Sequence, residues 1–508
     1  MYWMGVDVGT GGTRAILVDP RGQVVAGVTA PHEDMRMERP LWAEQRPENW
    51  RDAAFDAIRG VLNQAGVSGG SVRGIGLSGQ MHGLVVMDSE GQVVRPSLIW
   101  CDQRSQPQVD CINSIVGKDA ILKFIANPML TGFTLPKLLW VRDHEPANFQ
   151  RASKVLLPKD YLRFCLTEEF ASDVSDASGT GMFDVAGRRW SMDMMDALGL
   201  DRSLLPEAYE SSEITGAVSK KAAELTGLAT GTLVVAGAGD QAASAVGNGI
   251  VGAGAVSCTL GTSGVVFAHM ENLAYDPQGR VHTFCHAVPD KWHVMGVTQG
   301  AGLSLQWLRN RLAPDLDYDA LIAEAVTAPI GSDGLFWLPY LMGERTPHLD
   351  SQARGGWIGL TARHTRADLI RAVIEGVCYS QKDCLDLIEG LGVEASSVRA
   401  SGGGSRSVFW RQLLADVFGK PVARLATQEG SAHGAALLAL AGTGEYSGVP
   451  EVCKAALRET DKLTPRPEET ALYMKGHGIY KSLYPALRPA FESISDLAAE
   501  RWSTSQSD

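Results

Sequence analysis

The stretch that decides the fold is VDVGTGGTRAILVD, residues 6–19. Two runs of β-forming residues flank the turn Gly9-Thr10-Gly11-Gly12. Such a pattern is typical of a β-hairpin, and glycines in hairpin turns commonly take left-handed backbone angles. We therefore expect a hairpin near the start of the chain with left-handed glycines in its turn.

A second copy of this pattern lies about half a chain later, in SCTLGTSGVVF, residues 257–267. Its turn is Gly261-Thr262-Ser263-Gly264, again between two β-rich runs and again with threonine in second place. Two unrelated hairpins that share common turn residues would also explain the similarity. We favour a duplicated architecture of two like domains, because both turns agree in composition and in their flanking strands.

The segments after each turn alternate between strands and helices. Residues 72–77 indicate a short buried strand, and residues 47–60 and 409–417 indicate amphipathic helices. This alternation predicts α/β domains with mixed sheets, and the glycine-rich stretch at 247–254 is suited to a hinge. We therefore divide the chain into an N-terminal domain, a C-terminal domain and a helical extension with a frayed tail, at residues 1–246, 247–445 and 446–508.

The composition argues against several classes of protein. The chain has 508 residues and a formal net charge of -12, whereas a nucleic-acid site would need clustered Lys and Arg. No apolar run is long enough to span a membrane, and residues 1–5 show neither the basic nor the apolar region of a leader, so we expect none. The eight cysteines include no C-x-x-C pair, which is typical of reduced thiols. We expect a cytoplasmic protein that binds neither membranes nor nucleic acid.

Neither of the common nucleotide-binding motifs is present in its proper context. Gly247, Gly249 and Gly252 match G-x-G-x-x-G, but a dinucleotide fingerprint follows a strand and opens a helix. This triplet instead precedes the predicted strand at 255–260. No glycine-rich loop ends in Gly-Lys-Ser/Thr, so there is no Walker A sequence. A NAD enzyme is the weakest alternative, and ATP would have to bind by another route.

The paired Gly–Thr turns offer that route. Their backbone N–H groups and hydroxyls can form anion-binding concavities, and two of them facing each other would hold a triphosphate from both sides. Asp7 precedes the first turn and suits Mg²⁺, which takes one or two protein carboxylates together with phosphate oxygens. A carboxylate that merely supports the turn is the alternative. Arg14, just past the turn, is placed either to reach phosphate or to lie exposed on its strand.

An acidic residue follows an apolar strand in LVVAGAGDQAA, residues 233–243. Asp240 there is open to a structural interpretation, because Asp is a preferred helix N-cap. It is also open to a functional one, because α/β sheets place their ligands at the carboxyl ends of strands. In phosphoryl transfer such a group orients the attacking hydroxyl and accepts its proton. With an ordinary pKa of ~4 it would be ionised at neutral pH.

The segment SGQMHG, residues 78–83, follows the predicted strand at 72–77. A lone histidine more often makes a structural hydrogen bond. At the end of a strand and next to glycine, however, His82 is placed to contact the hydroxyls of a polyol. Met81 would then form an apolar wall against the carbon face of a sugar.

Eight motifs stand together in an order that resembles the FGGY carbohydrate kinases. They read GVDVGT, GQMHG, WCDQR, LLPKDY, GDQ, LGTSG, GERTPH and SGGG, at residues 5–10, 79–83, 100–104, 156–161, 239–241, 260–264, 343–348 and 401–404. The resemblance runs from about residue 4 to about residue 442. It implies the two-domain actin-like ATPase fold, also called ribonuclease H-like, with an inter-domain cleft.

The resemblance also implies a role for each matching residue. Asp240 would be the catalytic base, Asp7 would act beside Mg-ATP, and both are candidate metal ligands. The sugar would contact Gln80, Met81, His82, Trp100, Asp102, Asp240 and Gln241. ATP would lie against Gly9, Thr10, Gly11, Arg14, Gly261, Thr262, Gly302, Gly403, Gly404 and Ser407. Some family members have Asn where this chain has Gln241, whose longer amide could shift the preference for sugars.

The activity that the resemblance implies is the ATP-dependent phosphorylation of D-xylulose to D-xylulose 5-phosphate, with Mg²⁺ as cofactor. The triplet Gln80-Met81-His82 favours this ketopentose over glycerol, because family members that act on glycerol carry Arg-Glu there. One alternative is a kinase of the same fold for another ketopentose or polyol, such as ribulose or xylitol. Another is a non-catalytic actin-like module. The habit of the family further implies a homodimer.

Overall fold

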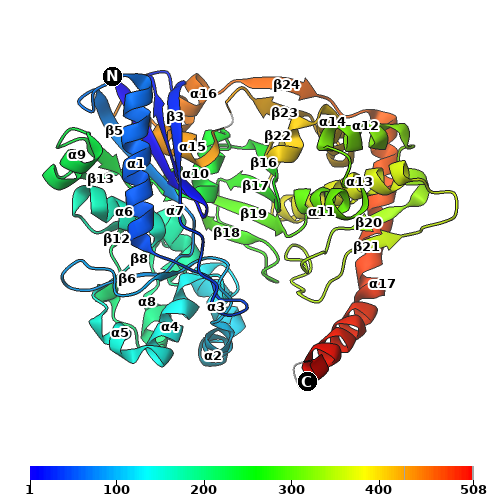
Figure 1. Cartoon of the computed structure of the whole chain (residues 1–508), viewed down its shortest axis with the longest axis horizontal. Helices are drawn as coiled ribbons and strands as arrows, with labels where there is room; N and C mark the ends of the chain where they lie inside the picture. The colour runs from blue at the N-terminus through cyan, green and yellow to red at the C-terminus, as the bar shows by residue number, and fades with distance from the viewer. Residues whose placement is uncertain (428, 506–508) are drawn as a thin grey trace.

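The computed structural model describes residues 1–427 and 429–505, with side chains up to residue 498, as two α/β lobes side by side (Figure 1). The sheet of the first lobe has the strand order β13-β14-β5-β1-β2-β3, and β15 also pairs with β5. Its strands are β1 (Tyr2–Val8), β2 (Gly12–Val18), β3 (Val24–Pro31), β5 (Val72–Gly79), β13 (Ile214–Ala217), β14 (Leu233–Val235) and β15 (Ala238–Gly239).

Three parallel strands of this sheet, β1, β5 and β15, end at the same edge. Asp7 on β1 pairs with Ser78 on β5, and Gly239 on β15 pairs with Gly79 on β5. The segments that follow β5 and β15 therefore emerge beside Asp7. This carboxyl edge is where open α/β sheets bind their ligands.

The sheet of the second lobe has the order β18-β19-β17-β16-β22-β23-β24. In each lobe an antiparallel hairpin carries the Gly–Thr turn, and its first strand pairs in parallel with β5 or β22 on its other side. The prediction of two like α/β domains is confirmed. The strands are β16 (Gly254–Leu260), β17 (Gly264–Met270), β18 (His282–Cys285), β19 (Trp292–Thr298), β22 (Ala395–Ser401), β23 (Val422–Leu425) and β24 (Glu459–Leu463).

The glycines of the two hairpins correct one expectation. None of them has the left-handed φ that we predicted. A Cβ on Gly12 would instead lie 2.8 Å from the Ala30 carbonyl oxygen, and one on Gly264 would lie 2.1 Å from Gln381 Nε2. Glycine is required at these two positions because neighbouring segments approach closely, not because of the backbone angle.

Helices cover both faces of the first sheet. On one face lies α1 (Pro47–Ala65), and on the other lie α10 (Asp240–Gly247) and α15 (Gly430–Gly442) (Figure 1). A Cβ on Gly5 would be only 1.9 Å from the Ala432 carbonyl oxygen, so α15 rests directly on β1. In space α15 therefore belongs to the first lobe, although its residues fall in our C-terminal domain. The division of the chain into domains stays a prediction.

The second sheet is covered by α11 (Gly302–Leu312), α13 (Arg366–Gly390) and α14 (Val408–Phe418). The last of these confirms the helix predicted at 409–417. It ends at Gly419, whose φ of 65° is the left-handed conformation that glycine favours at helix ends.

The C-terminal extension contains a strand as well as helices. After α16 (Val449–Ala456), strand β24 pairs with β23, and the long helix α17 (Pro467–Ser505) follows. Helix α17 packs on α13 and α14 and then projects from the second lobe (Figure 1). Of the predicted frayed tail, residues 506–508 lie outside the described residues.

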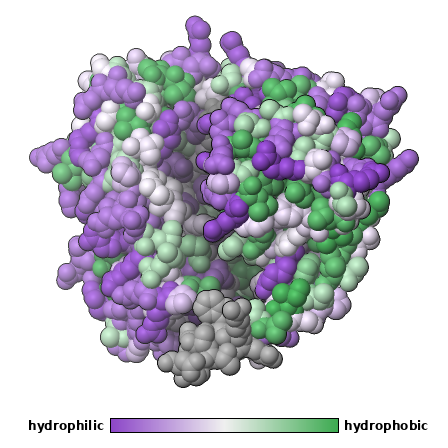
Figure 2. Space-filling model, turned by 45° about the vertical axis from the view of Figure 1, so that its right-hand side comes forward, coloured by the Kyte–Doolittle hydropathy of each residue, from purple (hydrophilic) through white to green (hydrophobic). Residues whose placement is uncertain are grey.

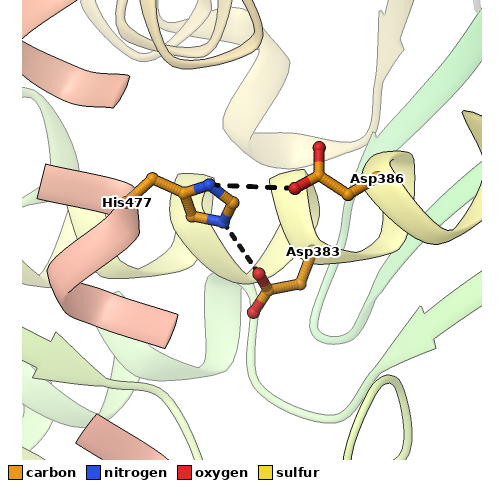
Figure 3. Close-up of side chains that lie close together, drawn as sticks. All are labelled: Asp383, Asp386 and His477. Atoms are coloured by element: carbon orange, nitrogen blue, oxygen red, sulfur yellow. Dashed lines mark hydrogen bonds and ion pairs between the residues drawn. The ribbon is translucent and has the colours of Figure 1, made fainter. Parts of the chain in front are cut away.

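A buried hydrogen bond anchors α17 to α13. His477 Nε2 lies 2.7 Å from Asp383 Oδ1, and its Nδ1 lies 3.9 Å from Asp386 Oδ2 (Figure 3). Lys382 and Lys481 also face Asp386. Because these two ammonium groups already balance the acidic pair, we interpret the cluster as a structural link between the helices.

Side chains of the first lobe also satisfy the edge of the second sheet. The Asn127 amide donates to the Thr283 carbonyl at 2.7 Å and accepts from the Thr283 N–H at 3.2 Å. Ser178 Oγ accepts from the Cys285 N–H at 3.1 Å. These bonds join the lobes along β18. Among the described residues, no helix has both the length and the apolar character needed to cross a membrane.

Candidate active site

A hollow runs between the two lobes on the face seen in Figure 2. A cavity of about 230 Å³ takes its walls from both lobes. From the first lobe come six of the predicted sugar contacts: Gln80, Met81, His82, Trp100, Asp240 and Gln241. From the second come Ser263, Val265, His282, Met295, Val297 and Arg345. The volume lies below the ~300–1,000 Å³ of sites for drug-sized ligands, and suits a small polar molecule.

His82 is held in one orientation within this cavity. Its Nδ1 lies 2.7 Å from the Gly179 carbonyl oxygen. Burial, assisted by Lys137, lowers the pKa of His82 to about 3, so the ring is neutral at physiological pH. We assign the proton to Nδ1, because only a donor can bond to a carbonyl. Nε2 is then a hydrogen-bond acceptor for a ligand hydroxyl.

Asp240 is the first residue of α10, directly after β15. The N-cap of this helix is Gly239, so the structural interpretation of Asp240 as N-cap is wrong. Burial, and next the charge of Asp7, raise the pKa of Asp240 to about 7. The expectation of an ordinary pKa was therefore wrong, because the residue lies in a poorly solvated cavity opposite another carboxylate.

Asp7 lies beside Asp240 at the edge of the first sheet. Ser78 Oγ donates to Asp7 Oδ1 at 2.8 Å, yet burial still raises the pKa of this carboxyl. Two carboxylates that disfavour each other's charge are a donor set that fits a divalent cation, which would offset their repulsion. Asp7 and Asp240 are thus chemically suited to the Mg²⁺ role that we predicted for them.

The first Gly–Thr turn contacts the walls of the same cavity. The Thr10 hydroxyl accepts from Trp100 Nε1 at 3.0 Å and donates to Gln80 Oε1 at 3.2 Å. The Thr10 carbonyl accepts from Gln45 Nε2 at 2.8 Å. Through these bonds the turn fixes Trp100 and Gln80, two of the predicted sugar contacts.

Asp102, another predicted sugar contact, does not line the cavity. It is fully buried, accepts from the Ala43 N–H at 2.6 Å, and pairs with Arg104 at 2.8 Å. Those contacts use Oδ2, and Oδ1 accepts from the Arg104 N–H at 3.0 Å, so the protein itself occupies both carboxylate oxygens. The structure indicates that Asp102 supports the segment beneath Trp100, and it does not support a direct contact to sugar.

A second, larger cavity of about 890 Å³ lies in the second lobe. Its walls include six of the predicted ATP contacts: Gly261, Thr262, Gly302, Gly403, Gly404 and Ser407. The turn of β16 and β17 borders both cavities, since Gly261 and Thr262 line the larger one and Ser263 lines the smaller. A group bound in either cavity therefore lies against the same short turn.

The remaining predicted ATP contacts do not line this larger cavity. They are Gly9, Thr10, Gly11 and Arg14 of the first hairpin. The Arg14 guanidinium pairs with Glu429 and donates to Thr29, so it links the first sheet to the start of α15. Its predicted contact with phosphate gains no support, because Glu429 and Thr29 already hold its Nε and Nη1.

Sequence reasoning missed the second-lobe wall of the small cavity. His282, Met295 and Val297 lie on strands and look like ordinary core residues in the sequence. Arg345 belongs to the GERTPH motif, which we noted without assigning it a role. The charge of this residue inside a glycine- and proline-containing turn motif was the one usable signal.

The LLPKDY motif forms a buried network behind Asp240. Lys159 Nζ lies 2.5 Å from Asp160 and 2.8 Å from Asp173, and 3.6 Å from Asp176. Burial raises the pKa of Asp176 well above its usual range, and Asp240 adds to this shift. Asp176 Oδ1 would be 3.3 Å from a Cβ on Gly239, so the network supports the backbone just before the predicted base.

Two like α/β lobes with a site between them define a two-domain kinase of the actin-like ATPase fold. Both lobes match models of the FGGY family of carbohydrate kinases, the N-terminal domain over residues 2–247 and the C-terminal domain over residues 256–443. The chain therefore belongs to the FGGY family of carbohydrate kinases.

Relatives within this family are similar over nearly the whole chain. The xylulose kinase of Escherichia coli (strain K12) is 42% identical over 490 residues, which cover 96% of this chain and 99% of that protein. The xylulose kinase of Bacillus subtilis (strain 168) is 37% identical, covering 95% and 96%. The crystal structure of xylulose kinase from Rhodospirillum rubrum has a TM-score of 0.91 at 33% identity, and covers 97% of this chain and 100% of that one.

Proposed function

We propose that the chain transfers the γ-phosphoryl group of ATP to the C5 hydroxyl of D-xylulose, giving D-xylulose 5-phosphate. The observation that carries the proposal is the turn at 261–263, which borders both a small cavity with Asp240 in its wall and a larger cavity. The names of the similar full-length kinases support the choice of sugar. In-line transfer needs the attacking and leaving oxygens on opposite sides of the γ-phosphorus, so donor and acceptor would have to meet beside this shared turn.

The larger cavity would hold the nucleotide. Gly403 leaves room for a flat base, because a Cβ there would meet no atom within 4 Å. Gly302 begins helix α11, where the helix dipole favours a phosphate. The Gly302 N–H donates to the Gly261 carbonyl at 2.7 Å, which keeps the turn against the start of this helix. The triphosphate would then lead past Thr262 toward the small cavity.

The smaller cavity would hold the sugar. His82 Nε2 would accept from a sugar hydroxyl, and Met81 would cover the carbon chain. Asp240 would orient the attacking hydroxyl and take up its proton. A pKa near 7 suits this task, because a base is most effective when its pKa is close to the working pH.

Mg²⁺ is the cofactor that the two facing carboxylates fit. When bound, it would neutralise charge on the phosphate oxygens. Asp7 would hold it directly or through water, with Ser78 fixing the carboxylate by its hydrogen bond. Asp240 would face the same ion from α10, so that its repulsion with Asp7 would be relieved.

Location and assembly are separate proposals. Because all eight cysteines are free thiols and five of them are buried, we place the protein in the reducing cytoplasm. The homodimer that the family resemblance implies stays a prediction.

The direct test is a coupled assay of ADP release with a panel of pentuloses, hexuloses and polyols. We expect the highest kcat/KM with D-xylulose and formation of the 5-phosphate, identified by NMR of the product. A higher kcat/KM with ribulose or another ketose would overturn the choice of sugar but keep the kinase. Hydrolysis of ATP that no sugar stimulates would favour the non-catalytic module instead.

A further inference from the structure

Arg345 brings the only second-lobe cation among the described residues that line the small cavity. It follows β20 (Phe336–Leu338) and is half-buried. Its guanidinium has no ion pair within 4.0 Å in the described part of the chain, and Glu344 is the sole charge that favours its ionisation. Arginine presents five donors and no acceptor, and it stays protonated in proteins. An unpaired guanidinium in a cavity wall is costly unless a ligand supplies acceptors.

The neighbouring carboxyl group is used elsewhere. Glu344 Oε1 accepts from the Gln299 N–H at 2.7 Å and from the Arg345 N–H at 2.8 Å. Burial raises the pKa of Glu344 to about 8, so it is largely neutral at pH 7. Glu344 therefore fixes the backbone of the turn and leaves the Arg345 side chain without a counter-ion.

The turn that carries Arg345 is rigidly attached to the cavity wall. Thr346 Oγ1 accepts from the Val297 N–H at 3.0 Å and donates to the Arg280 carbonyl at 2.7 Å. The Thr346 N–H donates to the Val297 carbonyl at 3.0 Å. Val297 itself lines the cavity. These bonds therefore fix the position of the Arg345 backbone in the cavity wall. A donor placed in advance in this way loses little entropy when a ligand binds.

Among the side chains around it, Arg345 is the charged hydrogen-bond donor in the second-lobe wall of the small cavity. The charge of Arg345 contributes to the low pKa values, about 3, of His82 and His282, after the larger effect of burial. Both rings are thus neutral. His82 offers an acceptor nitrogen, as derived above, so it suits a hydroxyl rather than a carbonyl. The cavity combines an acceptor, a base and one charged donor.

The chemistry of the proposed substrate calls for such a donor. A ketopentose closes its furanose ring through the C5 oxygen, so a sugar that is phosphorylated on that oxygen must react in its open-chain form. The open chain carries a free carbonyl at C2, which accepts hydrogen bonds and donates none. Asp240 would face the C5 hydroxyl from the first lobe, and the carbonyl lies toward the other end of the five-carbon chain.

Resting on the proposed function, we infer that Arg345 donates hydrogen bonds to the C2 carbonyl of the open-chain ketose. It thereby acts as a specificity residue that favours the ketose over the alditols obtained by reducing C2. The first lobe supplies the base and the second lobe supplies the carbonyl donor. A bound ketose therefore contacts both lobes. An alditol binds the second lobe more weakly, because its C2 hydroxyl is a poorer hydrogen-bond acceptor than a carbonyl for a charged donor.

The test compares D-xylulose with xylitol and D-arabinitol, its two C2-reduced alditols, in the wild type and in Arg345→Met. Hydrogen bonds to charged groups contribute ~1.5–3 kcal/mol, so we expect KM for D-xylulose to rise about 10- to 100-fold. KM for the alditols should rise less than threefold, and KM for ATP should stay unchanged. Arg345→Lys should recover part of the ketose affinity. Arg311→Met, on the exposed face of α11, is the matched control and should resemble the wild type.

Three results would overturn the inference. The first is an unchanged KM for D-xylulose in Arg345→Met. The second is an equal loss for ketose and alditols, which would indicate a contact to a shared hydroxyl. The third is a wild type that prefers D-xylonate, because Arg345 would then bind a carboxylate. If the wild type is inactive on D-xylulose but active on another ketose, the proposed substrate fails, and that ketose with its own alditols tests Arg345. A thermal melt and the KM for ATP identify a variant that is merely misfolded.

Discussion

The two Gly–Thr turns, at 9–11 and 261–263, have the same local design and different surroundings. Each joins an antiparallel pair of strands and each pair lies beside a parallel strand. In the first turn, Thr10 forms hydrogen bonds with Trp100, Gln80 and Gln45. In the second turn, Gly261 and Thr262 border the large cavity and Ser263 the small one.

This comparison shows that one motif can serve two purposes. The Thr10 side chain of the first turn holds Trp100 and Gln80 in the wall of the small cavity, while the second turn itself borders both cavities. Two turns of like sequence therefore need not bind ligands in the same way. We expect the same kind of substitution to have different effects at the two turns.

The largest effect is expected at Asp240, which lines the small cavity together with Ser263 of the second turn. Asp240→Asn removes the proton acceptor while keeping the shape of the side chain. We expect kcat to fall ~10²–10⁴-fold, as for the loss of a general base, with KM for ATP little changed. Steady-state kinetics measure this, and Asp315→Asn on the exposed surface is the control. Turnover within tenfold of the wild type would remove Asp240 from the role of base.

The next largest effect is a difference in KM that depends on how tightly a glycine at each turn is packed. A Cβ on Gly302 would lie 2.6 Å from the Gly261 carbonyl oxygen, whereas one on Gly11 meets no atom within 4 Å. Gly302→Ala should displace the second turn and raise KM for ATP by about tenfold or more, as for overpacking that costs ~1–3 kcal/mol. Gly11→Ala should change neither KM by more than about twofold. Equal effects of both substitutions would contradict the assignment of ATP to the second turn.

The pH dependence tests the environment of Asp240. A base must be unprotonated, and the pKa of Asp240 is raised to about 7. We therefore expect kcat/KM for the sugar to fall by about tenfold per pH unit below this value, and to level off above it. The slope should be lost in the residual activity of Asp240→Asn. A flat profile from pH 5 to 8 would show that the base titrates lower.

The same raised pKa has a consequence for stability. Between the unfolded pKa of ~3.9 and the folded value, the folded state holds the proton more tightly, so the contribution of Asp240 to stability is present at low pH and lost as pH rises toward 7. Substrate-free Asp240→Asn should therefore melt higher than the wild type at pH 8 and show little difference at pH 4. Differential scanning calorimetry measures both.

The smallest effects concern the threonine hydroxyls. Thr10→Val removes the bonds to Trp100 and Gln80 and should raise KM for the sugar by a few-fold, about 3- to 10-fold for lost hydrogen bonds of ~1 kcal/mol. Thr262→Val should instead raise KM for ATP by a similar factor. The two variants are each other's control, and an exchange of their effects would reverse our distinction between the turns.

Much of the fold could be predicted because it follows from local rules. The hairpins at residues 6–19 and 257–267 and the helix at 409–417 follow from turn residues and periodicity, which act over a few positions. Asp240 could be found because a carboxylate after an apolar strand is placed by the sheet itself. The surroundings of Asp102 and Arg14 could not be predicted, since nothing local shows that Arg104 and Glu429 are their partners.

The sequence by itself determined two like α/β lobes, the places of their glycine turns and the position of Asp240 at a strand end. Only the tertiary structure decided that Asp7 shifts the pKa of Asp240, that one turn borders both cavities, and that Arg345 lines the same small cavity as Asp240. The physical reason is the distance along the chain over which each interaction acts. Backbone hydrogen bonds and hydrophobic periodicity are set by near neighbours, whereas burial, charge coupling and cavity walls depend on segments hundreds of residues apart.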